Sequence, residues 1–175
     1  FVDKWKLVTQ SERAVVQSHF NDLCDLLGEP RPLDADPTGE NYAFEKGADK
    51  LGAGNGWADV WRRNCFAWEY KGKHKDLEKA LAQVRQYLNS LQNPPLMVAC
   101  DIERIIVVTI WTNEVSQRHE ILLEELIQQD KRDFLKKVFR GDPSLKSGET
   151  RAQLTQKVAG DFSDLARELQ EQGKE

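Results

Sequence analysis

The chain has 175 residues, of which 39% are hydrophobic and 31% are charged, and its formal net charge at pH 7 is −4. This composition excludes collagen-like, disordered and disulfide-rich small proteins, and the length suits one globular domain, alone or with a helical appendage. The acidic balance argues against a protein that holds nucleic acid by bulk electrostatic attraction alone.

The sequence also bears on location. No apolar run approaches the roughly 20 residues that a membrane span needs, so we expect a cytoplasmic protein with no membrane partner. Cys24, Cys65 and Cys100 are an odd number at wide spacings, which favours reduced thiols over disulfides or a zinc site. The chain begins at Phe1 without an initiator Met or an apolar leader, and we expect it to be part of a longer protein.

The first third of the chain predicts one helix and three strands. Apolar residues at helical spacing predict a helix over 9–27, with Thr9 and Glu12 as a capping box and Gly28 as its stop. A loop rich in Pro and Asp follows over 29–39. Short strands are then predicted over 42–46, 57–62 and 66–71.

A glycine-rich segment separates the first two predicted strands. Gly52, Gly54 and Gly56 form a Gly-x-Gly-x-Gly pattern, but a strand and not a helix follows it. Phosphate-binding loops of nucleotide-binding proteins open a helix. We therefore interpret the segment as a flexible hairpin loop.

The remaining chain predicts a second helix over 76–91, whose apolar stripe packs on a sheet, and two apolar strands over 96–100 and 104–111. Between them, the tetrad 93–96 (Asn-Pro-Pro-Leu) is similar to a methyltransferase motif but lacks its aromatic fourth residue, and we interpret it as a helix stop. Beyond residue 113, helical stripes are predicted to the end of the chain. The predicted fold class is α/β, with a mixed central sheet flanked by helices and a C-terminal helical extension.

The second and third strands place polar and apolar side chains on opposite faces. Glu69 and Lys71 project to one side of the third strand, and the aromatic residues between and before them project to the other. A hairpin turn centred on Asn64, a residue type that tolerates positive φ, places Asp59 opposite Glu69. Directly opposed Cβ atoms lie about 4.5–5.5 Å apart.

Two carboxylates at that separation repel each other unless a cation lies between them. Carboxylate oxygens favour Mg²⁺ or Mn²⁺, and Lys71 on the same face can orient a water molecule and offset charge on a phosphate. The pattern therefore indicates phosphodiester hydrolysis. Gln83 and Tyr87 lie at i and i+4 on the following helix, from which they could reach the same polar edge. The alternative is an ion-pair ladder on a solvent-facing hairpin.

Around these residues the sequence resembles the PD-(D/E)XK nuclease superfamily, and more closely the amino-terminal nuclease domain of MmeI-like single-chain restriction-modification enzymes. The resemblance covers roughly the first 125 residues. Its most specific segments are Ser11-Glu12-Arg13, Leu23 to Leu27, Asp36 to Gly39, Phe44 to Gly47 and Trp68 to Leu77.

By this resemblance, Asp59, Glu69 and Lys71 are the catalytic residues, and Asp59, Glu69 and the Tyr70 carbonyl hold the metal ion. Gln83 and Tyr87 match the Gln-x-x-x-Tyr pattern of some branches. The Pro that opens the family motif is absent here, because Ala58 precedes Asp59.

Several further residues have two interpretations. Glu12 could reach the metal ion from the first helix, although a capping role is favoured. His74, in the basic run 71–75, could assist proton transfer, but a phosphate contact or a turn role is favoured. His19 is interpreted as a packing or surface residue. The three tryptophans of the hairpin, Trp57, Trp61 and Trp68, are interpreted as core residues rather than as stacking platforms for bases.

The resemblance implies a nuclease domain over 1–118 and a helical connector over 119–175. It implies a Mg²⁺-dependent endonuclease that cuts double-stranded DNA and self-associates transiently on it. The downstream region would carry a methyltransferase domain that uses S-adenosylmethionine and a target-recognition domain. The alternatives are a non-catalytic DNA-docking or assembly module, or a nuclease of another phage-defence system.

Overall fold

The computed structural model describes residues 1–49 and 55–172, so the glycine-rich loop at Gly52 and Gly54 lies outside the described residues. The helices are α1 (Val2–Lys6), α2 (Glu12–Leu27), α3 (Pro32–Ala35), α4 (Leu77–Tyr87), α5 (Gln129–Arg140) and α6 (Arg151–Gln172), with two short 3₁₀ helices, η1 (Leu123–Ile127) and η2 (Pro143–Leu145). The strands are β1 (Tyr42–Asp49), β2 (Asn55–Arg62), β3 (Phe66–Tyr70), β4 (Leu96–Cys100), β5 (Arg104–Thr109) and β6 (Arg118–Leu122).

The strands form one sheet in chain order, from β1 at one edge to β6 at the other. Neighbouring strands are antiparallel except β3 and β4, which are parallel. A parallel pair requires a crossover connection, and α4 supplies it. The fold is therefore α/β with a mixed central sheet flanked by helices, which confirms the predicted fold class.

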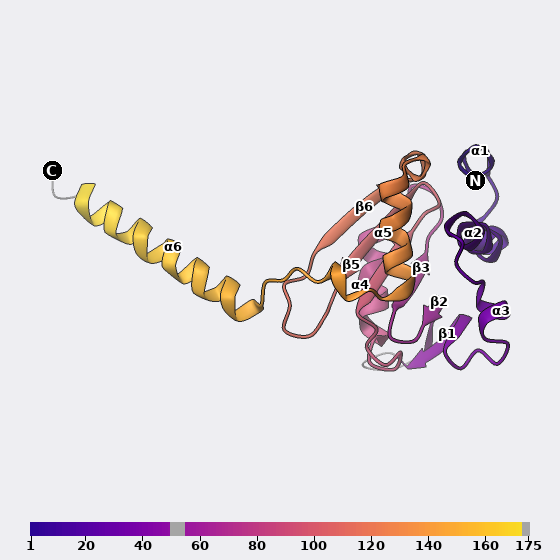
Figure 1. The fold of residues 1–175 in the computed structure, drawn as a ribbon, viewed down its shortest axis with the longest axis horizontal. Coiled ribbons are helices and arrows are strands. Elements are labelled where there is room, and N and C mark those ends of the chain that lie inside the picture. The colour runs from indigo at the N-terminus through magenta and orange to yellow at the C-terminus, as the bar shows by residue number, and fades with distance from the viewer. Residues whose placement is uncertain (50–54, 173–175) are drawn as a thin grey trace.

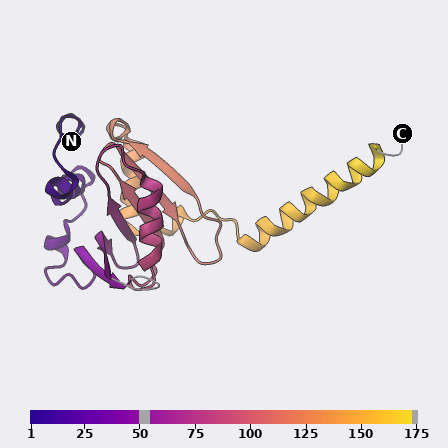
Figure 2. The same cartoon turned by 180° about the vertical axis from the view of Figure 1, so that it is seen from behind.

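Helices cover both faces of the sheet, as Figures 1 and 2 show from opposite sides. On one face, Phe66 and Trp68 of β3 pack with Phe20 of α2 and Phe139 of α5. On the other face, Ala67 belongs to a second apolar cluster that α4 completes. Because both faces are covered, β3 and β4 are buried along their whole length. The alternation of faces in β3 is the predicted one.

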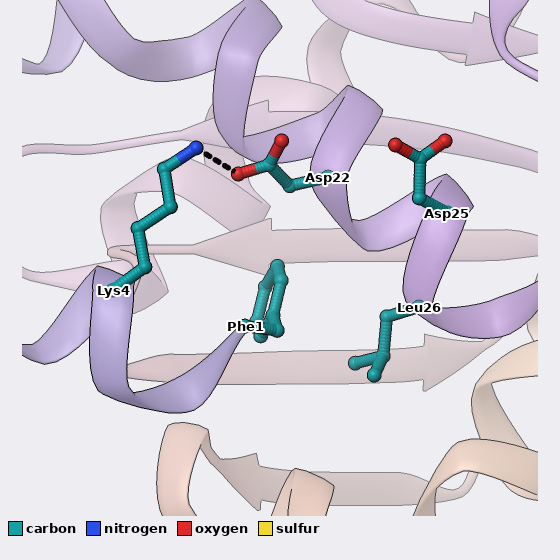
Figure 3. Close-up of a pocket in the computed structure, with 5 residues that line it drawn as sticks. All are labelled: Phe1, Lys4, Asp22, Asp25 and Leu26. Carbon is teal, nitrogen blue, oxygen red and sulfur yellow. Dashed lines mark hydrogen bonds and ion pairs between the residues drawn. The ribbon is translucent and has the colours of Figure 1, made fainter.

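The N-terminal helix α1 lies against α2 through a shared carboxylate. Lys4 forms an ion pair with Asp22, and the indole N–H of Trp5 donates a hydrogen bond to the same carboxylate at 2.9 Å. Figure 3 shows Lys4 and Asp22 directed toward each other above Phe1 and Leu26, which line the same pocket. One turn of helix carries too little periodicity to be predicted from the sequence.

The start of α2 differs from the prediction. The helix begins at Glu12 with Ser11 as its N-cap, so the predicted start at Thr9 and the capping box from Thr9 are wrong. Serine is itself a preferred N-cap residue, and Ser11 has the extended backbone that this position requires. The helix end is as predicted, with Gly28 in the left-handed region at φ 67°.

Residues 118–122 also differ from the prediction, because they form a strand rather than part of a helix. β6 pairs antiparallel with β5, and the predicted domain boundary after residue 118 falls within it. The side chain of Ile121 is buried in the core. Pairing with β6 satisfies backbone groups of β5 that would otherwise form an open sheet edge.

Helix α5 is anchored to the sheet by packing and by buried polar contacts. The ring of Phe139 is fully buried and stacks on Phe20, with ring centroids 5.3 Å apart. Arg62 of β2 donates to the Phe139 carbonyl at 3.0 Å, and Arg140 donates to the buried Glu29 at 2.7 Å. These contacts join α5 to the core of the sheet, although it lies in the range 119–175 that was predicted to be a connector.

The C-terminal helix α6 extends away from the sheet (Figures 1 and 2), and its side chains are exposed from Arg151 to Gln170. Its helical structure confirms the predicted C-terminal extension. None of the described helices is both long enough and apolar enough to span a membrane.

Candidate active site

The hairpin of β2 and β3 carries the predicted acidic pair. Its register pairs Val60 with Trp68, and Asn64 in the turn has a φ of 58°. The turn centre is as predicted. The pairing of β2 with β3 ends at Val60 and Trp68, one step before the predicted pair of Asp59 and Glu69.

β2 and β3 separate beyond their last pair, because successive side chains of β2 no longer alternate between the two faces of the sheet there. Val60 packs in the cluster under α2, whereas Ala58 packs in the cluster under α4. In a regular strand, residues 58 and 60 would share a face. In the neighbouring strand β1, Glu45 has a positive φ of 50°, although its neighbours Phe44 and Lys46 stay in register with β2.

Asp59 lies at this parting of the strands and binds the backbone of β3. Its Oδ2 accepts a hydrogen bond from the Tyr70 N–H at 2.6 Å. The next amide, that of Lys71, donates to Cys100 in β4 at 2.8 Å, on the other side of the strand. The carboxylate of Asp59 is thereby held beside the peptide unit that joins Glu69 to Tyr70.

Glu69 is the most enclosed member of the site. It is only 3% exposed, and its carboxylate accepts hydrogen bonds from three side chains. Lys71 Nζ and Gln83 Nε2 each lie 2.7 Å from Oε1, and the Tyr87 hydroxyl lies 2.7 Å from Oε2. A buried carboxylate requires such donors, because desolvation disfavours its charge. The structure thus brings together six of the residues predicted for this site: Asp59, Glu69, Tyr70, Lys71, Gln83 and Tyr87.

Helix α4 supplies two of these donors. Its N-cap Asp76 accepts hydrogen bonds from the amides of Glu78 and Lys79 at 3.0 and 3.3 Å. Residues four apart lie on one side of a helix, so Gln83 and Tyr87 reach the same carboxylate. The helix ends at Tyr87, earlier than the predicted Leu91, and turns connect it to β4.

The ionisation of Tyr87 suits a hydrogen-bond donor. Burial raises the pKa of its hydroxyl above the ordinary value of 10, and the adjacent Glu69 carboxylate raises it further. The hydroxyl therefore stays protonated at neutral pH and donates a hydrogen bond to Glu69.

The other side of the sheet holds Tyr70 in place through His19, a contact that the sequence did not predict. The Nδ1 atom of His19 lies 2.8 Å from the Tyr70 hydroxyl, and the two rings meet edge to face. Burial lowers the pKa of His19 to about 3, against a smaller opposing effect of Asp22. The imidazole is therefore neutral in the folded protein at neutral pH.

This burial predicts an acid-sensitive fold. Below about pH 6.5 the unfolded chain protonates His19 while the folded chain does not, so stability falls by about 1.4 kcal/mol per pH unit down to about pH 3. Denaturant unfolding between pH 4 and 8 measures this slope. His19→Asn, which does not titrate, should lose that part of the slope, and an unchanged slope in this variant would contradict the assignment.

The predicted auxiliary residue His74 contacts the turn between β4 and β5. His74 Nδ1 lies 3.5 Å from a carboxylate oxygen of Glu103 in the turn between β4 and β5, and Lys73 pairs with the same carboxylate at 3.3 Å. His74 has a positive φ of 61°, which fits the turn interpretation. The side chain of Glu12 lies outside the described residues, so its predicted metal contact stays a prediction.

The carboxylates of Asp59 and Glu69 and the carbonyl of Tyr70 are oxygen donors of the kind that bind divalent metal ions. Among the side chains that the structure describes, no three His, Cys, Asp or Glu residues gather where they could hold a metal ion. A Mg²⁺ ion commonly takes one or two carboxylates and completes its shell with water and substrate phosphate, whereas zinc takes three or four protein ligands. The carboxylates of Asp59 and Glu69 with the Tyr70 carbonyl therefore fit Mg²⁺ or Mn²⁺ better than zinc.

Comparison with known protein families assigns the chain to a family. The family described as the MmeI N-terminal domain matches residues 1–172. The chain belongs to this family. Comparison with curated proteins and with solved structures found no match. The match confirms the predicted resemblance to the N-terminal domain of MmeI-like enzymes, and it extends over α5 and α6.

Proposed function

We propose that this MmeI N-terminal domain is the Mg²⁺-dependent endonuclease domain of a restriction-modification enzyme and hydrolyses phosphodiester bonds of double-stranded DNA. The observation that carries the proposal is the convergence at the end of β3. The Asp59 carboxylate binds the Tyr70 amide at 2.6 Å, and the adjacent Glu69 binds Lys71 at 2.7 Å.

The arrangement of elements supports assignment to the PD-(D/E)XK superfamily. The acidic pair lies on an antiparallel hairpin, and α4 then crosses over to the parallel strand β4. Glu69 on β3 and Lys71 directly after it occupy the Glu-x-Lys positions, and Asp59 occupies the preceding acidic position on β2. An isolated ion-pair ladder facing solvent would not bury Glu69 beneath Gln83 and Tyr87.

The side chains have distinct parts in the proposed mechanism. Asp59, Glu69 and the Tyr70 carbonyl would hold Mg²⁺, or Mn²⁺ in its place, and the ion would supply Lewis-acid polarisation of the phosphate. Lys71 Nζ orients the attacking water and offsets the negative charge that develops on phosphorus oxygens. Gln83 and Tyr87 hold the Glu69 carboxylate in one orientation, as outer hydrogen-bond donors commonly do at metal sites.

The restriction-modification context extends the proposal beyond this chain. A methyltransferase domain using S-adenosylmethionine and a target-recognition domain would follow in the full protein. One active site cuts one strand, so double-strand cleavage requires two copies to meet on DNA. We propose that this self-association is transient.

Nicking of supercoiled plasmid by the 175-residue protein tests the proposal. At low salt, we expect nicked and linear DNA with Mg²⁺ or Mn²⁺ and intact plasmid with EDTA. Low salt is needed because a chain with a net charge of −4 offers few phosphate contacts, and these weaken as salt rises.

The control is Lys71→Ala, which keeps both carboxylates. If wild type binds DNA but neither protein nicks it with either metal, the chain is a docking or assembly module instead. If Lys71→Ala cuts as fast as wild type, the proposed role of the lysine is wrong.

A further inference from the structure

A cleft of about 640 Å³ lies between α2 and the strands β1 and β2, on the side of Asp59 away from α4. Its volume is within the range of roughly 300–1,000 Å³ that is usual for sites that bind small molecules. Asp59 forms part of its wall and is the residue that the cleft shares with the candidate active site. The residues that matter for its chemistry are Gln17, Ser18, Glu45, Trp57 and Asp59.

Trp57 gives this cleft a flat aromatic surface. The sequence interpretation placed it in the core with Trp61 and Trp68, and this is wrong for Trp57, which is 54% exposed. A methyl group added at Gly47 of β1 would lie 3.5 Å from the Trp57 Nε1 atom. This is an ordinary van der Waals distance, so the indole lies close beside β1 while much of it stays exposed.

Exposure of a single apolar side chain is common and does not by itself indicate a site. The position of Trp57 does indicate a site, because Trp57 lies two residues before Asp59 and lines the same polar cleft. An indole held there can stack on a planar ligand that approaches the acidic pair.

The charges of the cleft select the kind of ligand. Two of the residues that line it, Glu45 and Asp59, carry carboxylates. Without a metal ion, these carboxylates repel a phosphate group but do not repel an uncharged nucleobase. Gln17 and Ser18 are exposed on α2 and can donate to and accept hydrogen bonds from the edge of a base.

We propose that this cleft binds a nucleobase of the DNA substrate, with Trp57 as its stacking platform, next to the phosphate that is cleaved. The inference rests on the proposed nuclease function and adds a substrate preference to it. A paired base within a duplex has no free face, so the bound base must leave the stack. The protein should therefore bind DNA with an unpaired nucleotide more tightly than uninterrupted duplex.

Fluorescence anisotropy in EDTA tests binding without cleavage. The probes are two labelled duplexes of one sequence, of which one carries a single extrahelical nucleotide. We expect wild type to prefer the second duplex, Trp57→Ala to weaken its binding by about 10-fold, and Trp57→Phe to retain most of it, because a phenyl ring also stacks. Leu33→Ala, at a side chain that is 70% exposed on α3, is the matched control and should bind like wild type.

Equal binding of both duplexes by wild type, or unchanged binding by Trp57→Ala, would overturn the inference. Far-UV circular dichroism of each variant separates lost binding from lost folding. The plasmid assay is independent of this test. Absence of nicking together with Trp57-dependent binding refutes the nuclease proposal alone, whereas nicking without Trp57-dependent binding refutes the base-binding cleft alone.

Discussion

Replacing Glu69 by glutamine is expected to reduce the rate of Mg²⁺-dependent plasmid nicking by about 1,000-fold. The substitution keeps the shape of the side chain but removes the charge that would bind the metal ion. It also alters the contacts with Lys71, Gln83 and Tyr87, each 2.7 Å from the carboxylate. The measurement is the initial rate of nicking at saturating DNA.

Graded variants distinguish the carboxylate itself from its surroundings. Asp59→Asn should match Glu69→Gln, because both carboxylates would hold the same ion. Tyr87→Phe removes only one hydrogen bond to Glu69 and should cost about 10-fold. A Glu69→Gln protein that still nicks DNA at a rate similar to Tyr87→Phe would exclude Glu69 from direct metal binding.

Replacing Phe139 by alanine is expected to destabilise the protein by about 3–5 kcal/mol. The ring is fully buried, where it stacks on Phe20 and contacts Phe66 and Trp68. Its removal leaves a cavity in the cluster under α2 and α5. Urea unfolding followed by circular dichroism measures the change in free energy.

Phe162→Ala on α6 is the matched control, because the same substitution there removes a ring that is 68% exposed. A surface change of this kind should alter stability by no more than about 0.5 kcal/mol. Equal effects of the two substitutions would show that α5, like α6, contributes little to the folded core.

Much of the candidate site could be predicted from local patterns. Asn64 centres the hairpin because its side chain tolerates positive φ, and strand alternation then fixes which residues share a face. The apolar stripe of α4 predicts its docking on the sheet, and this docking places Gln83 and Tyr87 near Glu69. These features depend on residues that are close in sequence or regularly spaced.

The features that were missed depend on tertiary contacts. The change of faces between Ala58 and Val60 carries no glycine or proline, and Glu45 is an unusual residue for positive φ. His19 and Tyr70 are 51 residues apart, so their hydrogen bond leaves no local pattern. In β6, the apolar pair Ile121 and Leu122 fits helical spacing with later residues as well as it fits a strand.

The parallel pairing of β3 with β4 has a consequence for the order in which the site is assembled. The hairpin of β2 and β3 closes through a short turn, so Asp59 can reach the Tyr70 amide early in folding. Gln83 and Tyr87 arrive only when the crossover has closed and α4 has docked, and closure of a longer segment is slower. The same docking event completes the hydrogen bonds of Glu69, so we expect the acidic site to form later in folding than the hairpin that carries it.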